Sequence, residues 1–184
     1  MKKLLLAAAF LIPFIAKAQS SSPAFAYKSE GKYFYYSDVV KVDSTLDVPD
    51  LYKDAQLFLK KLALPNIKIT TDDAKGGTLA SDVDEKTTFK TETGIGSEDL
   101  DIKYSLKIEM KKGRYRYTID NIILTYIGAD HKSNPHTLGE LDKDKSGGPF
   151  GLGRSKRILT AMNNLFLDHI DLMAKNMSKK SDDF

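Results

Sequence analysis

Residues 99–126 read DLDIKYSLKIEMKKGRYRYTIDNIILTY, and this stretch decides the fold. From Leu100 to Met110 every second residue is apolar and the residues between them are polar, which is the pattern of a β-strand with one buried face. Lys112 and Gly113 follow, and glycine supplies the positive φ that a two-residue hairpin turn requires. The sequence therefore predicts two long antiparallel strands joined by a tight turn.

This turn also predicts the register of the two strands. It sets apolar residues opposite one another: Met110 opposite Tyr115, Ile108 opposite Tyr117, and Leu106 opposite Ile119. On the other face, Arg116 is expected opposite Glu109. A shift by one residue would bury Arg114 and Arg116 among apolar side chains, which is costly for unpaired charges. The apolar positions change phase after Asp120, so we expect a β-bulge near Asp120–Asn121.

A strand and a helix are expected before this hairpin. Residues 32–42 are rich in Tyr and Val and predict a first strand. Asp47 suits the N-cap of a helix and Pro49 suits its first turn, so a helix is expected over residues 48–63. Its apolar residues recur at helical spacing, which predicts that one side of this helix is buried.

Two more strands and a second helix complete the prediction. Residues 67–71 form a short strand pattern, and residues 78–90 form a longer, more polar one that is expected at an edge of the sheet. The last helix is expected over residues 154–177. It carries an apolar stripe with the spacing of a core face, formed by Leu159, Met162, Phe166, Ile170, Met173 and Met177.

The helix start DVPDLYKDAQLFL (residues 47–59) and the hairpin YSLKIEMKKGRYRYTIDNI (residues 104–122) resemble a known family. It is the domain of unknown function numbered 4468, which comprises exported bacterial proteins, mainly of the Bacteroidetes group, with a TBP-like fold. One departure is that the family often has Trp in the first helix, where Leu57 or Phe58 stands here. The resemblance covers Phe34 to Tyr126.

This resemblance implies an α+β fold in which a curved antiparallel sheet, in the order β-α-β-β-β-β-α, carries both helices on one face. That order agrees with the elements predicted from the residues. The family has no assigned catalytic residues, and a shared fold does not transfer the DNA binding of TATA-binding protein.

The N-terminus has the pattern of a Sec signal peptide. A basic start precedes the apolar run from Leu4 to Ile15, and Ala16-Lys17-Ala18 places small residues at the cleavage positions. We therefore expect residues 1–18 to be removed on export. The chain has no cysteine, so a lipoprotein anchor and disulfides are excluded, and the expected location is the periplasm or the extracellular space.

The remaining chain is expected to form one domain. Residues 19–31 are predicted to be a flexible tail, residues 32–177 a single TBP-like domain, and residues 178–184 a polar C-terminal tail. No transmembrane span is expected after cleavage of the signal peptide.

Charge bears on the class of partner. The full chain has 28 Lys and Arg against 25 Asp and Glu; removing residues 1–18 removes Lys2, Lys3 and Lys17 and no acidic residue, which leaves 25 of each sign. Alternating Arg and Tyr also occur on nucleic-acid-binding surfaces, but a neutral exported protein whose tyrosines point into the core does not fit that role. We therefore predict no nucleic-acid partner.

Residues 128–153 are rich in Gly, Pro and charged residues and predict a long loop. Within it, Asp142, Asp144 and Ser146 have the spacing of the first oxygen ligands of a calcium loop, and Gly147 stands at the sixth position. Gly153 occupies the twelfth position, where an EF-hand has a bidentate Glu. Calcium is therefore a minor alternative to a solvated turn, and no other cofactor is expected.

Two functional hypotheses from different classes remain. The favoured one is a non-enzymatic envelope module that binds a protein, peptide or glycan through the polar sheet face, whose candidate residues are Lys103, Lys107, Glu109, Arg114 and Arg116. The alternative is a carrier of a small amphipathic ligand, held in a tyrosine-lined cavity between the sheet and the last helix. No residues have the spacing of a catalytic nucleophile and base, so an enzyme is not predicted.

Overall fold

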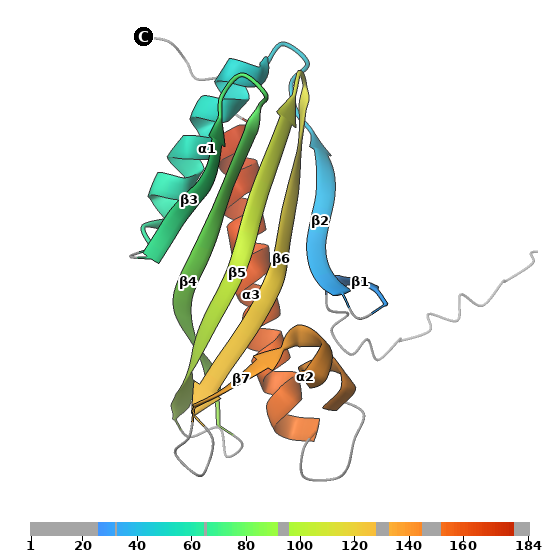
Figure 1. Ribbon diagram of the computed structural model, residues 1–184, viewed down its shortest axis with the longest axis vertical. Helices are drawn as coiled ribbons and strands as arrows, with labels where there is room; N and C mark the ends of the chain where they lie inside the picture. The colour runs from blue at the N-terminus through green and yellow to red at the C-terminus, as the bar shows by residue number, and fades with distance from the viewer. Residues whose placement is uncertain are drawn as a thin grey trace, which may run out of the picture.

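The computed structural model describes residues 26–31, 33–64, 66–91, 96–127, 133–144 and 152–178. An antiparallel sheet and helices make up this part of the chain (Figure 1). The elements in chain order are β1 (Lys28–Glu30), β2 (Tyr33–Lys41), α1 (Val48–Leu62), β3 (Asn66–Asp73), β4 (Thr78–Lys90), β5 (Ser97–Lys111), β6 (Arg114–Ile127), β7 (Ser133–Thr137), α2 (Leu138–Asp144) and α3 (Leu152–Met177).

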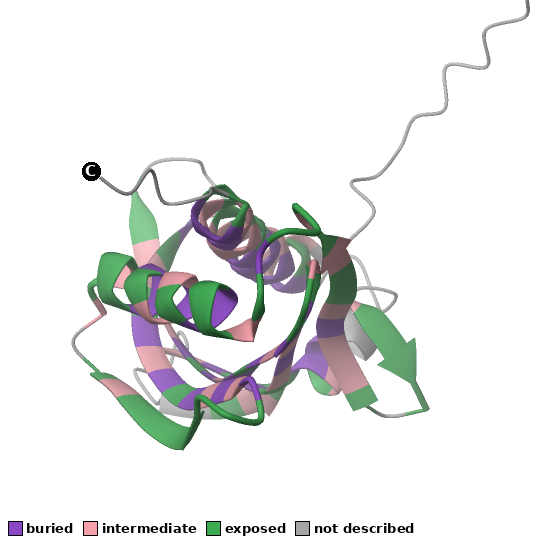
Figure 2. Cartoon of the chain, turned by 90° about the horizontal axis from the view of Figure 1, so that it is seen from above, coloured by how far each residue is buried: buried purple, intermediate pink, exposed green. Residues whose placement is uncertain are grey.

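The strands form one sheet in the order β1-β2-β6-β5-β4-β3, and all neighbours are antiparallel. Strand β7 also pairs with β6, along the half of β6 that lies beyond β2. Helices α1 and α3 lie on the same side of the curved sheet (Figure 2). The predicted α+β architecture, with both long helices on one face, is therefore confirmed.

The β5–β6 hairpin has the predicted register. Met110 pairs with Tyr115, Ile108 with Tyr117, and Leu106 with Ile119, while Glu109 pairs with Arg116 on the other face. Gly113 has φ 68°, the left-handed conformation that the tight turn needs. An added Cβ at Gly113 would lie 3.1 Å from the Ser44 Cα, so this position also has little room.

The predicted bulge is present at the expected place. The pairing shifts between Lys103 and Ser105, which pair with Ile123 and Asp120, so β6 contains one extra residue. Asn121 lies in this segment with φ 53°, a conformation that Asn tolerates better than most residues. The bulge accounts for the phase change, because Ile122 and Leu124 return to the core face after it.

Helix α1 begins as the sequence predicts. The Asp47 side chain accepts a hydrogen bond from the Asp50 backbone N–H, and the Asp50 side chain accepts one from the Asp47 N–H, which completes a capping box. Ala63 ends the helix in the left-handed conformation, with φ 49°.

The core lies between the sheet and the two long helices. The ring of Phe166 on α3 packs edge-on against Tyr36 on β2 and Tyr104 on β5, at centroid distances of 5.1 and 4.9 Å. The predicted stripe of α3 is buried except for Ile170, which is half-buried.

Three expectations about the elements are wrong. Residues 19–31 were expected to be only a tail, but Lys28–Glu30 form β1 against β2. The loop expected over residues 128–153 contains β7 and α2. These additions extend the predicted order of elements. Strand β4 is interior rather than at an edge, because it pairs with β3 on one side and with β5 on the other; β3 is the edge strand.

Candidate functional site

The side of the sheet opposite the helices is a continuous polar surface, which we call the polar face. Its members alternate with core residues along the strands. They include Asp82 and Asp84 on β4, Lys103, Ser105, Lys107 and Glu109 on β5, and Arg114, Arg116, Thr118 and Asp120 on β6. All five candidate residues from the sequence, Lys103, Lys107, Glu109, Arg114 and Arg116, lie on this face.

Opposite charges are paired on the polar face. The Glu109 carboxylate lies 3.1 Å from the Lys107 Nζ and 3.5 Å from the Arg116 Nε, so it bridges two cations. The Lys103 Nζ lies 3.2 Å from the Asp84 carboxylate. These side chains are exposed, so each pair contributes only about 0–1 kcal/mol to stability. Their charges remain accessible to a partner.

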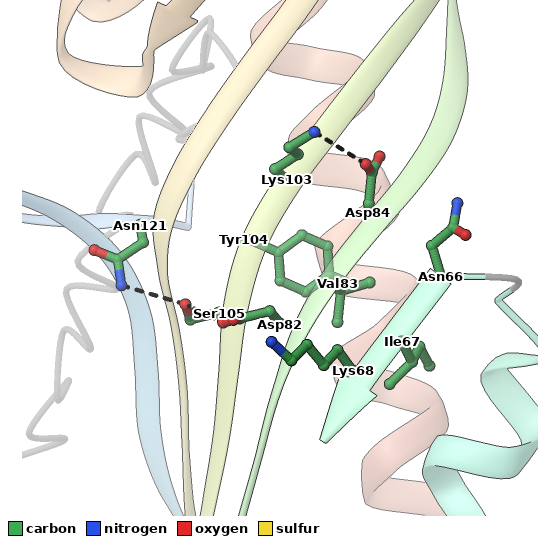
Figure 3. A pocket seen from close by; sticks show the side chains of 10 residues that line it. All are labelled: Asn66, Ile67, Lys68, Asp82, Val83, Asp84, Lys103, Tyr104, Ser105 and Asn121. Carbon is green, nitrogen blue, oxygen red and sulfur yellow. Dashed lines mark hydrogen bonds and ion pairs between the residues drawn. The ribbon is translucent and has the colours of Figure 1, made fainter. Parts of the chain in front are cut away.

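A shallow groove of about 640 Å³ crosses the polar face from β3 to β6 (Figure 3). Hydrogen bonds connect the side chains along it: the Asn121 amide donates to the Ser105 hydroxyl at 3.3 Å, and that hydroxyl donates to the Asp82 carboxylate at 3.0 Å. The lining residues are Asn66, Ile67, Lys68, Asp82, Val83, Asp84, Lys103, Tyr104, Ser105 and Asn121. Neutral and charged groups thus alternate along a surface large enough for several residues of a ligand.

Tyr33 on β2 extends the polar face beyond the bulge. Its hydroxyl donates a 2.6 Å hydrogen bond to the Asp120 carboxylate, next to Asn121. This hydrogen bond is the main reason why the pKa of Tyr33 is raised to about 12, with burial and the Asp120 charge adding to it. Tyr33 remains 46% exposed as a residue, so its ring is available to a ligand as a flat apolar surface.

Positive charge gathers at the β5–β6 turn. Lys41, Arg114 and Lys111 are direct cross-strand neighbours and are all exposed. Like charges directly opposite one another destabilise a sheet. A hollow of about 260 Å³ lies beside them, with Val39 and Arg116 in its lining. The sequence placed Arg114 and Arg116 on this face but gave no sign that Lys41 joins them, because β2 is distant in the chain.

A second polar cluster, which the sequence did not reveal, is buried under α3. The His169 Nε2 lies 2.9 and 3.1 Å from the two carboxylate oxygens of Glu85 on β4. The side chains of Glu85 and His169 are 3% and 13% exposed. Burial, followed by the Glu85 charge, raises the pKa of the neighbouring Tyr104 hydroxyl. Since α3 covers this cluster, it holds the helix on the sheet rather than offering groups to a substrate.

The tyrosines proposed to line a carrier cavity are packed instead against their neighbours. Tyr104, Tyr115 and Tyr117 are buried in the core, as predicted from their alternation. Tyr104 fills the space beneath α3 by contact with Phe166. Tyr126 lies at the end of the sheet and stacks on His136 with 5.0 Å between ring centroids. This packing provides no support for a ligand between the sheet and α3.

The calcium prediction falls largely outside the described residues. Asp142 and Asp144 belong to the end of α2, and Ser146 is not among the residues that the structure describes. In the described part of the chain, no three His, Asp or Glu side chains come together as a metal site would require. Calcium binding stays an untested prediction.

None of the helices in the described residues has both the length and the apolar character needed to cross a bilayer.

An antiparallel sheet with long helices on one face and an open polar face defines an α+β protein of the TBP-like class. Residues 36–125 match the family described as "Domain of unknown function (DUF4468) with TBP-like fold", which confirms the family resemblance found in the sequence. No curated protein matches the chain.

Several solved structures share the fold, including two from Bacteroides and Parabacteroides species. One is a DUF4468 family protein from Bacteroides ovatus, with a TM-score of 0.66 and 14% identity over 88% of this chain and 95% of that one. The other is a TBP-like protein from Parabacteroides distasonis, with a TM-score of 0.59 and 18% identity over 81% of this chain and 97% of that one. At such identities the likeness concerns the fold alone.

Proposed function

We propose that this protein is an exported, non-enzymatic binding module of the cell envelope, and that its polar face contacts a protein, peptide or glycan. The groove of about 640 Å³ across four strands is the observation that carries this proposal. Its rigid sheet scaffold presents side chains at fixed spacing, which lowers the entropy lost on binding.

The charges of the polar face favour selective binding. Glu109 lies between Lys107 and Arg116, and Asp84 lies beside Lys103, so both signs alternate over short distances. A partner must present charges opposite in sign to those of the polar face in order to replace these contacts. A partner with a different arrangement of charges would bring like charges together. Export fits the N-terminal signal pattern, in which Leu4 to Ile15 is the apolar run.

Site-specific photo-crosslinking in cells that naturally produce the protein tests this proposal. A photoreactive residue replaces Lys107, which lies in the middle of the polar face, and the matched control carries it at Lys53, an exposed lysine of α1. We expect a discrete adduct from position 107 and none from position 53. Absence of an adduct at 107, or equal adducts at both positions, would contradict the proposal.

A further inference from the structure

Strand β3 is an open edge of the sheet. It pairs with β4 on one side, and no strand in the described residues pairs with its other side. Alternate backbone N–H and C=O groups along its eight residues therefore point away from the sheet. Such a row of groups is a template for another extended chain.

A groove of about 360 Å³, lined mainly by aliphatic residues, runs beside this edge, between β3 and α1. It exists because the buried face of α1, which includes Leu51 and Phe58, packs against α3, β4 and β5 and leaves the helix-facing side of β3 only partly covered. Ile69 is consequently 50% exposed. The lining residues are Gln56, Leu59, Lys60, Ala63, Leu64, Ile67 and Ile69.

The two ends of the groove are fixed by contacts between α1 and β3. At one end the Tyr52 hydroxyl donates a hydrogen bond to the Asp72 carboxylate, which joins the start of the helix to the end of the strand. At the other end the chain reverses directly from α1 into β3, with Ala63 in the left-handed conformation. Only two of the eight β3 residues, Ile67 and Ile69, line the groove, so about two side chains of an added strand would enter it.

We propose that β3 and this groove bind an extended peptide segment of a partner protein as an additional strand. Backbone hydrogen bonds to β3 hold the peptide, and its alternate side chains enter the groove, because successive residues of a strand point to opposite faces. Ile67 and Ile69 are two residues apart on β3, so both point into the groove. They therefore favour aliphatic side chains at two alternate positions of the peptide. Lys60 on the rim favours an acidic residue beside them.

A second copy of this chain fits the edge less well than a separate peptide does. The pairing of β3 with β4 shifts between Ile69 and Thr71, so Thr70 forms a bulge in the middle of the strand. If two copies of β3 paired with each other, the bulge of each strand would interrupt the regular backbone pairing near the middle of the other. Lys68 is exposed on β3, and lysines and bulges are features that discourage identical edges from pairing.

This site shares only Ile67 with the lining of the polar-face groove, and Ile69 belongs to the peptide groove alone, so the Ile69 variants distinguish the two proposals. The groove lies on the helix side of β3, whereas Lys103, Lys107 and Glu109 lie on the opposite side of the sheet. Replacing Lys107 is expected to leave peptide binding unchanged.

Selection from a phage-displayed library of random octapeptides, with the purified protein as target, tests the proposal. We expect enriched peptides with aliphatic residues at alternate positions. The affinity of a synthetic enriched peptide is then measured by fluorescence anisotropy for two variants, Ile69→Lys in the groove and Leu57→Lys as the control. Leu57 is an aliphatic residue of α1 that is 44% exposed and outside the groove lining.

Ile69→Lys is expected to weaken binding at least about tenfold, which corresponds to the loss of one buried aliphatic contact, while Leu57→Lys changes little. Circular dichroism checks that both variants are folded, and Ile69→Thr, which keeps β-propensity, provides a second groove variant. The bound peptide is also expected to slow amide hydrogen exchange in residues 66–73.

Three outcomes of the peptide experiments would overturn the proposal. They are a selection without enrichment, enriched peptides that bind the Ile69→Lys variant as well as the wild type, and unchanged exchange in β3 on binding. A dimer detected by sedimentation and abolished by Ile69→Lys would also overturn it, because a second copy would then cover the edge.

Discussion

Replacing His169 by leucine removes the imidazole that faces the buried Glu85 carboxylate. The two groups lie 2.9 Å apart between α3 and β4, and their side chains are 13% and 3% exposed. A carboxylate at such a depth is costly when it loses its partner, because little water can replace the lost interaction. The variant is therefore expected to be much less stable than the wild type.

The expected magnitude follows from this burial. Removing one partner of a buried pair lowers the free energy of unfolding by about 3–5 kcal/mol. Replacing both residues, in the double variant Glu85→Leu with His169→Leu, restores a packed apolar contact and is expected to recover most of that loss. An exposed pair provides the control: Lys103→Leu opposite Asp84, with side chains 61% and 40% exposed, should cost less than about 1 kcal/mol.

Urea denaturation followed by circular dichroism measures all four proteins under the same conditions. Unchanged m-values would show that the variants unfold from similarly compact states. A loss of less than about 1 kcal/mol for His169→Leu, or a double variant less stable than that single variant, would refute the reasoning.

Three further predictions concern the core and the polar face. Phe166→Ala removes a fully buried ring and should lower the free energy of unfolding by about 3–5 kcal/mol; denaturation showing less than about 1 kcal/mol would mean that the ring does not pack as described. A double-mutant cycle at Glu109 and Arg116 should give a coupling of about 0.2–1 kcal/mol that disappears at about 1 M salt, and zero coupling at low salt would count against the pair. In an ultraviolet titration Tyr33 should ionise at about pH 12 and at lower pH in Asp120→Asn, with Tyr33→Phe identifying its signal. Because that pKa lies above the ordinary value of about 10, the contribution of this hydrogen bond to stability is complete below pH 10 and is lost as the pH rises to 12. Identical ultraviolet titrations of the wild type and of Asp120→Asn would argue against the contact between Tyr33 and Asp120.

The β5–β6 hairpin could be predicted in detail because local rules determine it. Strict alternation fixes the faces, Gly113 fixes the turn, and the cost of burying Arg114 and Arg116 excludes the shifted register. The bulge was predictable for the same reason, since a change of apolar phase within one strand requires an extra residue.

The elements that the sequence did not predict lack such a pattern. Strand β1 has three residues, KSE, with no apolar member, and β7 contains a proline, so neither resembles a strand in isolation. They form because β2 and β6 offer unpaired backbone groups. The polarity of β4 predicts an edge strand, but most of its polar residues lie on the open side of the sheet, and one that does not, Glu85, is buried against His169.

The candidate site was predictable only in part. The alternation of β5 and β6 identified the five polar-face residues, but the groove also depends on β3 and β4, whose alignment is set by the whole sheet. The β3 edge and its neighbouring groove arise from where α1 packs on the sheet, and periodicity along one segment contains no information about that placement.

The most direct test of the central claim is the affinity of the partner captured by crosslinking at position 107. Isothermal titration would compare the wild type with Lys103→Ala/Lys107→Ala on the polar face and with Lys53→Ala/Lys175→Ala, at exposed positions of α1 and α3 outside both grooves. Each polar-face contact contributes on the order of 1 kcal/mol, so the polar-face variant should bind at least about tenfold more weakly, while the helix variant keeps the wild-type affinity. Equal affinity of all three proteins would contradict a binding role for the polar face.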